Sequence, residues 1–147
     1  MSSSYTASAR LLIIVAFATA WACQGSAPAS ATQLIENIAG YVSEAQAQDS
    51  SFIAFSADRG RLLFSSSPAT GKPDTPSCTA CHTPDPTRVG QTRAGKEIAP
   101  MALSKTPDRY ADAAKLEKWF RRNCTSVLGR VCTALEKGDF LTFMSTQ

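Results

Sequence analysis

Histidine is almost absent from this chain, because its 147 residues include only one, His82. A metal centre with two imidazole ligands is therefore excluded. The sequence also lacks the alternation of apolar and polar residues that indicates strands, and no strand–helix–strand pattern is visible. Its formal net charge is only +3. The basic residues are scattered, so the chain has no basic tract of the kind that binds nucleic acid.

Long hydrophobic runs are absent as well, apart from residues 11–22 near the start. Residues 1–10 before this run are polar with a single charge, and Ala29-Ser30-Ala31 after it offers a small-x-small cleavage site. The run is too short to span a bilayer comfortably, so the pattern is typical of a secretory signal peptide. We expect residues 1–31 to be removed by cleavage at that site.

The alternative for the leader is a lipoprotein signal, with Cys23 carrying the lipid. Trp21 disfavours it, because this bulky residue stands where such a signal has small ones. Cleavage of the leader leaves residues 32–147, a length that suits a single domain with one small core. We expect this domain to work in the bacterial periplasm.

The stretch Cys78-Thr79-Ala80-Cys81-His82 is a Cys-x-x-Cys-His motif, which is typical of covalent haem attachment. Its two thiols can add to the two vinyl groups of one porphyrin, and the histidine is then positioned as the proximal iron ligand. A zinc site would need a second pair of ligands at suitable spacing, and a thioredoxin-like motif would need a strand-to-helix junction. Neither is visible, so the sequence predicts one haem c.

Two cysteines, Cys124 and Cys132, remain once the leader and the motif are set aside. In an oxidising compartment such a pair is interpreted first as a disulfide, here closing a short loop that contains Gly129. In the chain-entropy account, so short a loop contributes roughly 2–3 kcal/mol. A pair of buried free thiols is the alternative.

Apolar residues at helical spacing predict an all-α chain of four or five short helices around one covalent haem. Thr32 can cap the first helix and Ser56 the second, while Thr133 and Glu136 form a capping-box pattern for the last. Gly60 lies inside the second helix, where glycine is unfavourable, and the close approach of another helix would explain it.

Two stretches complete this outline. A polar loop rich in proline and glycine is expected over residues 83–98, and its arginines and lysine could meet haem propionates. A further helix is expected over Tyr110–Arg122, with Trp119 on its apolar stripe as a cofactor-binding residue.

The ligand on the second side of the iron decides between electron transfer and ligand binding. Methionine is the usual choice for electron transfer, and residues 32–147 contain only Met101 and Met144. Pro100 precedes Met101, and in small c-type cytochromes a proline near this place commonly accepts a hydrogen bond from the proximal histidine. We therefore expect Pro100 at the cofactor on the proximal side, with Met101 beside it. Met144 is expected in the core.

Asn123 offers a different ligand. It lies four residues after Trp119 and seven after Leu116, so periodicity places it on the core-facing stripe of its helix. A buried amide must find a partner, and the haem iron is one candidate. Periodicity alone favours a simpler alternative, an asparagine at the helix C-terminus that bonds backbone carbonyls.

Three segments carry a family resemblance, namely Gly71–His82, Gly90–Pro100 and Arg122–Cys132. With them, the chain from about Gln33 onward resembles the sphaeroides haem protein (SHP) family of oxygen-binding class I c-type cytochromes. The resemblance implies a class I cytochrome c fold. It also implies that Asn123 is the sixth ligand of the oxidised iron and that the two cysteines of the last segment form a disulfide.

The resemblance implies a function as well. In the SHP family the amide leaves on reduction, which opens the iron to O2 or NO, and electrons come from a diheme cytochrome c linked to a membrane cytochrome b. An amide oxygen is a hard, weak donor that suits ferric better than ferrous iron, which agrees with such release. Proteins resembling cytochrome c″ carry histidine where this chain has Asn123.

Two alternatives stay open. One is a plain electron-transfer cytochrome with Met101 or Met144 bound to iron; at Met101 the chain departs from SHP-like sequences, which have another apolar residue there. The other is an enzyme that reduces oxygen or nitrogen oxides, which the same open ferrous site would permit.

Overall fold

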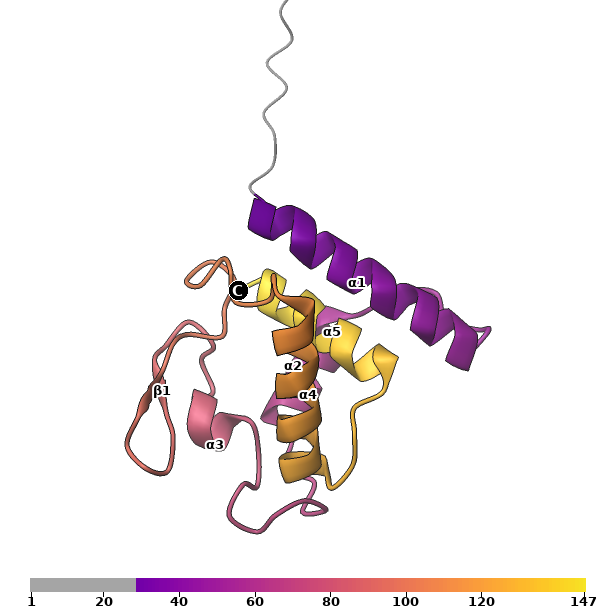
Figure 1. Ribbon diagram of the computed structural model, residues 1–147. Helices are drawn as coiled ribbons and strands as arrows, with labels where there is room; N and C mark the ends of the chain where they lie inside the picture. The colour runs from indigo at the N-terminus through magenta and orange to yellow at the C-terminus, as the bar shows by residue number, and fades with distance from the viewer. Residues whose placement is uncertain (1–28) are drawn as a thin grey trace, which may run out of the picture.

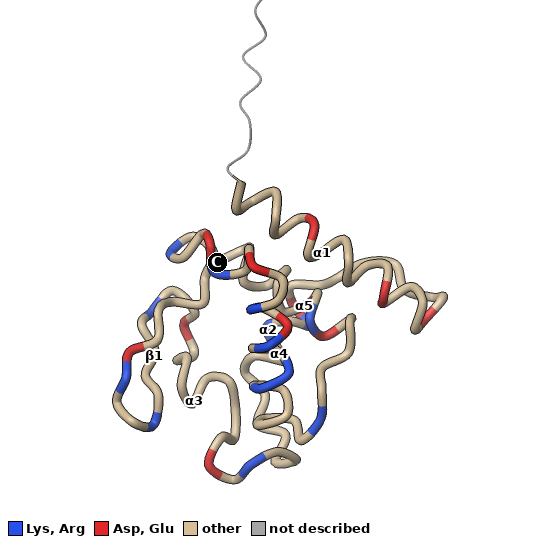
Figure 2. Tube along the Cα trace, viewed as in Figure 1, with Lys and Arg blue, Asp and Glu red and all other residues tan. Residues whose placement is uncertain are grey.

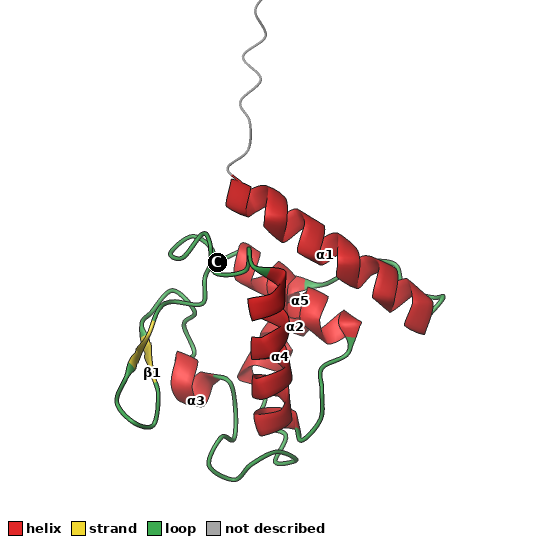
Figure 3. Ribbon diagram, viewed as in Figure 1, coloured by secondary structure: helices red, strands yellow, loops and turns green. Residues whose placement is uncertain are grey.

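The computed structural model describes residues 29–147, in which helices predominate (Figures 1 and 3). The helices are α1 Ala29–Gln48, α2 Ala57–Ser65, α3 Thr79–His82, α4 Ala113–Leu128 and α5 Ala134–Ser145. The strands β1 Gly90–Gln91 and β2 Glu97–Ile98 form a minimal antiparallel hairpin inside the predicted 83–98 loop. The predicted all-α class is confirmed.

The predicted leader falls almost entirely outside the described residues. Only its last three residues, Ala29-Ser30-Ala31, are described, and they form the first turn of α1. The apolar run at 11–22 and Cys23 lie outside the described residues. Within residues 29–147, no helix combines the length and the apolar character needed to cross a bilayer.

Helix α1 starts three residues before Thr32, its expected cap, and ends at Gln48. Thr32 is therefore not its cap, because alanines before it favour the helix and allow it to begin sooner. The helix packs against α5 and buries Leu34, Tyr41 and Ala45. These three residues recur at helical spacing, as predicted.

Helix α2 packs tightly along α5, and here the local predictions are confirmed. The Ser56 hydroxyl accepts the Arg59 amide at 3.3 Å as the helix cap. A Cβ on Gly60 would lie 2.0 Å from the carbonyl oxygen of Asp139, so glycine is needed for the helices to approach so closely. The Asp139 carboxylate is buried and binds Arg59 at 2.7 Å and the Ser56 amide at 2.6 Å.

Helix α4 differs from its prediction at both ends. It was expected over Tyr110–Arg122 and instead begins at Ala113, because the Asp112 side chain caps it by accepting the amide of Lys115 at 2.9 Å. It ends only before Gly129, whose φ of 70° is left-handed and suits glycine. The longer course places residue 123 well inside the helix.

A polar contact joins α1, α4 and α5 beside the aromatic core. The Tyr41 hydroxyl donates to Glu117, and both carboxylate oxygens of Glu117 accept from Lys137 at 2.9 Å. The Lys137 ammonium also lies 5.1 Å from the centre of the Tyr41 ring, and Phe120 meets that ring edge to face. This cluster holds one side of α4 firmly against the other two helices.

Candidate functional site

The Cys-x-x-Cys-His motif forms the single helical turn α3. The His82 amide donates to the carbonyl of Cys78 at 3.0 Å, so these two residues lie one turn apart on the same side. The buried Ser77 hydroxyl accepts the amide of Ala80 at 3.1 Å and starts the turn. Thr83, with φ 62°, ends it directly after the imidazole. The motif therefore presents its three reactive side chains from one compact turn.

The His82 imidazole has the properties of a ligand to a metal. Its Nδ1 atom is buried and has no hydrogen-bond partner within residues 29–147. Burial, and to a lesser degree the positive charge of Arg109, lowers the pKa of His82 to about 4. The ring is therefore neutral at physiological pH and keeps a nitrogen lone pair free for a metal.

The thiols of Cys78 and Cys81 are both free and partly buried. Burial raises the pKa of the Cys78 thiol to about 11, so this sulfur is a neutral thiol at neutral pH. In the part of the chain that the structure describes, no three His, Cys, Asp or Glu side chains are grouped to hold a metal ion. Within the described residues the motif thus lacks the further ligands that a structural zinc site needs, and its two free thiols fit two thioether bonds.

His82 Nδ1 has no hydrogen-bond partner within residues 29–147, so the bond expected from it to the Pro100 carbonyl is not present in this structure, and the contact of Pro100 with the cofactor stays a prediction. The Pro100 carbonyl instead accepts the Thr106 hydroxyl at 3.0 Å, and the next carbonyl, of Met101, accepts the Tyr110 hydroxyl at 2.6 Å. These two hydrogen bonds fix the backbone at residues 100 and 101 to side chains of the segment that follows, residues 106–110. The side chain of Met101 is buried in the aromatic core.

Asn123 lies on α4, but on a different face from the one predicted. The buried stripe of the helix consists of Leu116, Phe120, Cys124 and Val127. Asn123 is exposed, and Trp119 beside it is 44% exposed. The prediction was wrong because Trp119 and Phe120 are both apolar neighbours in sequence, and only packing decides which of them faces the core.

The alternative interpretation of Asn123 is also wrong. The residue does not lie at the helix C-terminus, and its side chain makes no hydrogen bond to any residue in the 29–147 range. Trp119 lies one turn earlier on the same face, with the Arg122 guanidinium 5.6 Å from its ring centre. This face of α4 therefore presents a flat aromatic surface next to a free amide.

The charge on this helix is mostly positive. Figure 2 shows basic residues along α4, and four of them are exposed: Lys115, Lys118, Arg121 and Arg122. None of the four forms a salt bridge to a described residue, whereas Glu117 is paired with Lys137. The exposed side of α4 is therefore electropositive.

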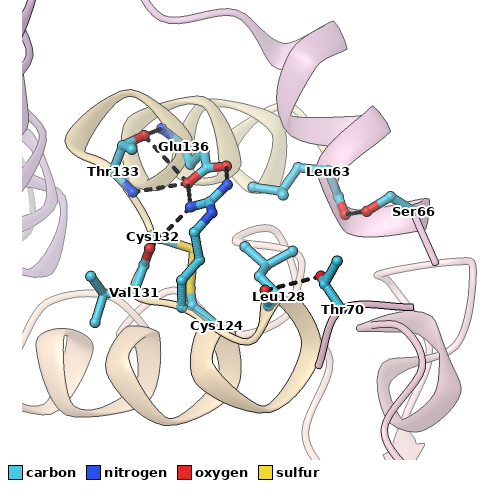
Figure 4. Close-up of polar contacts among 10 residues, drawn as sticks. Leu63, Ser66, Thr70, Cys124, Leu128, Val131, Cys132, Thr133 and Glu136 are labelled. Carbon is cyan, nitrogen blue, oxygen red and sulfur yellow. Dashed lines mark hydrogen bonds and ion pairs between the residues drawn. A yellow bond between two sulfur atoms is a disulfide. The ribbon is translucent and has the colours of Figure 1, made fainter. Parts of the chain in front are cut away.

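The two remaining cysteines join the end of α4 to the start of α5. Cys124 and Cys132 form a disulfide with their Cα atoms 5.6 Å apart (Figure 4). At the start of α5, the Thr133 hydroxyl accepts the Glu136 amide, and the Glu136 carboxylate accepts the Thr133 amide at 2.9 Å. The predicted capping box is therefore confirmed. Asn123 is thus directly followed by a residue that is covalently anchored.

A cavity of about 340 Å³ lies on the outer side of α3, between this turn and the β1–β2 hairpin. Cys81, Gly90 and Arg93 are among its lining residues, and none comes from α4. Gly90 is needed here, because a Cβ would lie 2.3 Å from the Cys81 carbonyl oxygen. Asn123 is not among its lining residues, and Arg93 forms an ion pair with Asp74.

The residues present fit a c-type haem. Two free thiols and a neutral, partly buried imidazole whose buried Nδ1 has no partner in the described chain lie on one turn, as covalent attachment and proximal ligation require. The exposed Trp119 ring and the free amide of Asn123 supply an apolar face and an oxygen donor from α4. The sequence did not indicate that the loop before the motif, residues 70–75, contacts the end of α4. Its turn-rich residues carry no periodic pattern that would predict a contact with a distant helix.

Comparisons with known proteins agree with these observations. A family model described as a domain of unknown function (DUF1924) matches residues 50–144. The chain is 54% identical over 123 residues to the cytochrome c-type protein SHP of Cereibacter sphaeroides, covering 84% of this chain and 91% of that protein. It is 31% identical over 108 residues to cytochrome c″ of Methylophilus methylotrophus, covering 73% and 75% of the two chains.

Solved structures give the same relationship. Oxidised SHP, an oxygen-binding cytochrome c, matches with a TM-score of 0.71 at 54% identity, over 78% of this chain and 96% of that chain. Oxidised cytochrome c″ from Methylophilus methylotrophus matches with a TM-score of 0.67 at 28% identity, over 79% and 95%. The predicted cytochrome c fold is confirmed, and so is the resemblance to the SHP family.

Proposed function

The chain belongs to the family of c-type cytochromes that includes SHP, and on this premise we propose that it is a monohaem cytochrome that binds a diatomic gas when reduced. Such a haem would supply an iron that accepts one electron and offers a binding site for O2 or NO. Cys78 and Cys81 would hold it through thioethers. His82 would bind the iron on the proximal side.

Asn123 is proposed as the distal ligand of the ferric iron. The single observation that supports this best is its exposed amide, which has no partner within residues 29–147 and lies one turn from the exposed ring of Trp119. The two methionines that could compete for the iron lie elsewhere. The Met144 side chain is fully buried and that of Met101 is almost fully buried, both inside the aromatic core. Core packing accounts for both methionines without a bond to iron.

Release of this amide on reduction would couple electron input to gas binding. A neutral amide oxygen is a hard donor, and its affinity for iron falls when the iron gains an electron. The related SHP is described as oxygen-binding, and the solution structure of cytochrome c″ addresses haem-ligand detachment. Both descriptions support an iron whose second side opens, here through the movement of Asn123.

The cellular setting is part of the same proposal. The leader over residues 1–31 and the Cys124–Cys132 disulfide are both typical of an exported protein, so we place the chain in the periplasm. A diheme cytochrome c linked to a membrane cytochrome b is proposed as the electron donor. The exposed cations of α4 would attract an acidic surface on such a donor.

Optical spectra of the holoprotein test the proposal. In Asn123→Ala, the ferric iron should become five-coordinate or water-bound, while the reduced wild-type protein should bind carbon monoxide. Asn37→Ala is the matched control, because the Asn37 amide donates to the Tyr110 carbonyl at 2.8 Å and has a purely structural role. Its spectra should match those of the wild type.

Two results would contradict the proposal. A near-infrared sulfur-to-iron band that disappears in Met101→Leu or Met144→Leu would establish methionine ligation and a plain electron-transfer role. Reduced protein that remains six-coordinate and low-spin and ignores carbon monoxide would exclude redox-gated binding. Sustained consumption of oxygen or nitric oxide with a reductant would instead favour an enzyme.

A further inference from the structure

The last turn of α4 is held by the loop that precedes the haem motif, residues 70–75, which we call the 70–75 loop. The Lys72 amide donates to the Ser126 carbonyl at 2.7 Å, and the Thr75 hydroxyl donates to the same oxygen at 3.0 Å. The Thr70 hydroxyl donates to the Leu128 carbonyl at 3.0 Å, as Figure 4 shows. The final carbonyls of a helix have no partners inside it, so the loop satisfies groups that otherwise need water.

The two main chains also touch directly. A Cβ on Gly71 would lie 2.2 Å from the Ser126 carbonyl oxygen, and a Cβ on Gly129 would lie 2.3 Å from the carbonyl oxygen of Thr70. No side chain therefore separates the loop from the helix end at these two points. Because backbone meets backbone, a shift of the loop must move the helix end as well.

The position of this contact links the two sides of the haem site. Thr75 stands three residues before Cys78, and Ser126 stands three residues after Asn123. The path from the first haem thiol to the distal amide therefore crosses one hydrogen bond and two short pieces of chain. One of these pieces is rigid helix, in which three residues rise about 4.5 Å.

We propose that Thr70 and Thr75 are positioning residues for Asn123. Their hydroxyls hold the end of α4 in register with the haem-bearing segment, so that the amide stays within reach of the ferric iron. An amide is a weak ligand, and its occupancy depends on being held in place beforehand. This inference rests on the proposed role of Asn123 and adds the residues that set its affinity for iron.

Competition with added imidazole tests the inference in the ferric holoprotein. Added imidazole must displace Asn123 from the iron. A loosely held Asn123 amide therefore raises the apparent affinity of the protein for imidazole. In Thr70→Val combined with Thr75→Val, loss of two hydroxyl hydrogen bonds should tighten apparent imidazole binding about fivefold. In the Asn123→Ala background, the same two substitutions should change it by less than about twofold, because no amide is left to position.

Matched controls separate positioning from stability. Thr142→Val removes a hydroxyl bond of 2.8 Å to the Gly138 carbonyl within α5 and should leave imidazole binding unchanged. Serine at 70 and 75 keeps both hydroxyls and should restore the wild-type affinity. If the double valine variant fails to take up haem, Thr70→Val alone is titrated, with the same direction expected.

The outcomes are distinct. A gain in imidazole affinity of equal size in both backgrounds, no gain at all, or the same gain in Thr142→Val would overturn the positioning role while leaving Asn123 as a ligand. If Asn123→Ala itself changes neither the ferric spectrum nor imidazole affinity, the assignment of Asn123 fails, and the inference fails with it.

Discussion

Replacing Asp139 by alanine should destabilise the protein strongly, because this carboxylate joins α2 to α5. The side chain is buried and accepts hydrogen bonds from three donors: the Ser56 amide at 2.6 Å, Arg59 Nε at 2.7 Å and Arg59 Nη2 at 2.8 Å. The substitution removes both carboxylate oxygens, so all three donors lose their acceptor at once. It also leaves the Ser56 amide without its partner at the start of α2.

The size of the effect follows from the exposure of each donor. A hydrogen bond to a charged group contributes about 1.5–3 kcal/mol, but half of the Arg59 side chain is exposed, so water replaces part of that contact. The Ser56 amide is partly buried, and losing a helix-capping partner costs about 1 kcal/mol. Together we expect Asp139→Ala to lower the free energy of unfolding by about 3 kcal/mol.

Urea unfolding of the haem-loaded protein measures this difference, with the slope m unchanged and the midpoint lowered. Asp58→Ala is the control, because Asp58 is 87% exposed and lies 3.6 Å from Arg61 in a surface pair. It should change stability by less than about 0.5 kcal/mol. A loss below about 1 kcal/mol in Asp139→Ala, or equal losses in the two variants, would refute the reasoning.

Two further predictions concern the junction between α4 and α5. Replacing both Cys124 and Cys132 by serine should lower the free energy of unfolding by roughly 2–3 kcal/mol, measured as a lower urea midpoint, and a thiol reductant should then have no further effect. The hydrogen bond from Arg130 holds the pKa of Glu136 below its usual value, so the stability from this carboxylate is present near neutral pH and is lost as pH falls through the lowered pKa. Unfolding measured from pH 7 down to pH 3 should therefore show a smaller loss of stability in Glu136→Gln, and parallel curves for the two proteins would contradict this.

Local features of the fold were predictable because neighbouring residues alone produce them. The Ser56 cap and the Thr133–Glu136 capping box depend on side chains reaching amides three residues away. The two caps need no knowledge of how the helices pack. Gly60 is different, because a glycine inside a helix indicates that another segment lies close, but only the structure shows that this segment is α5.

The ends of α4 and the orientation of Asn123 were not predictable in the same way. The pattern around Tyr110 allowed a helix to begin there, but the Asp112 cap determines where it begins. Trp119 and Phe120 are both apolar, so periodicity left two adjacent faces as candidates for the core. Phe120 packs on Tyr41 and α5, which turns Trp119 and Asn123 outward.

The sequence by itself determined the chemistry proposed for one side of the haem. Cys78, Cys81 and His82 lie together because they are close along the chain, and a single helical turn suffices to present them. The other side was decided by the tertiary structure. The place of Asn123, the proposed distal ligand, depends on how α4 packs on α5, and the 70–75 loop hydrogen-bonds the last turn of that helix; such contacts between distant segments leave no periodic trace in the sequence.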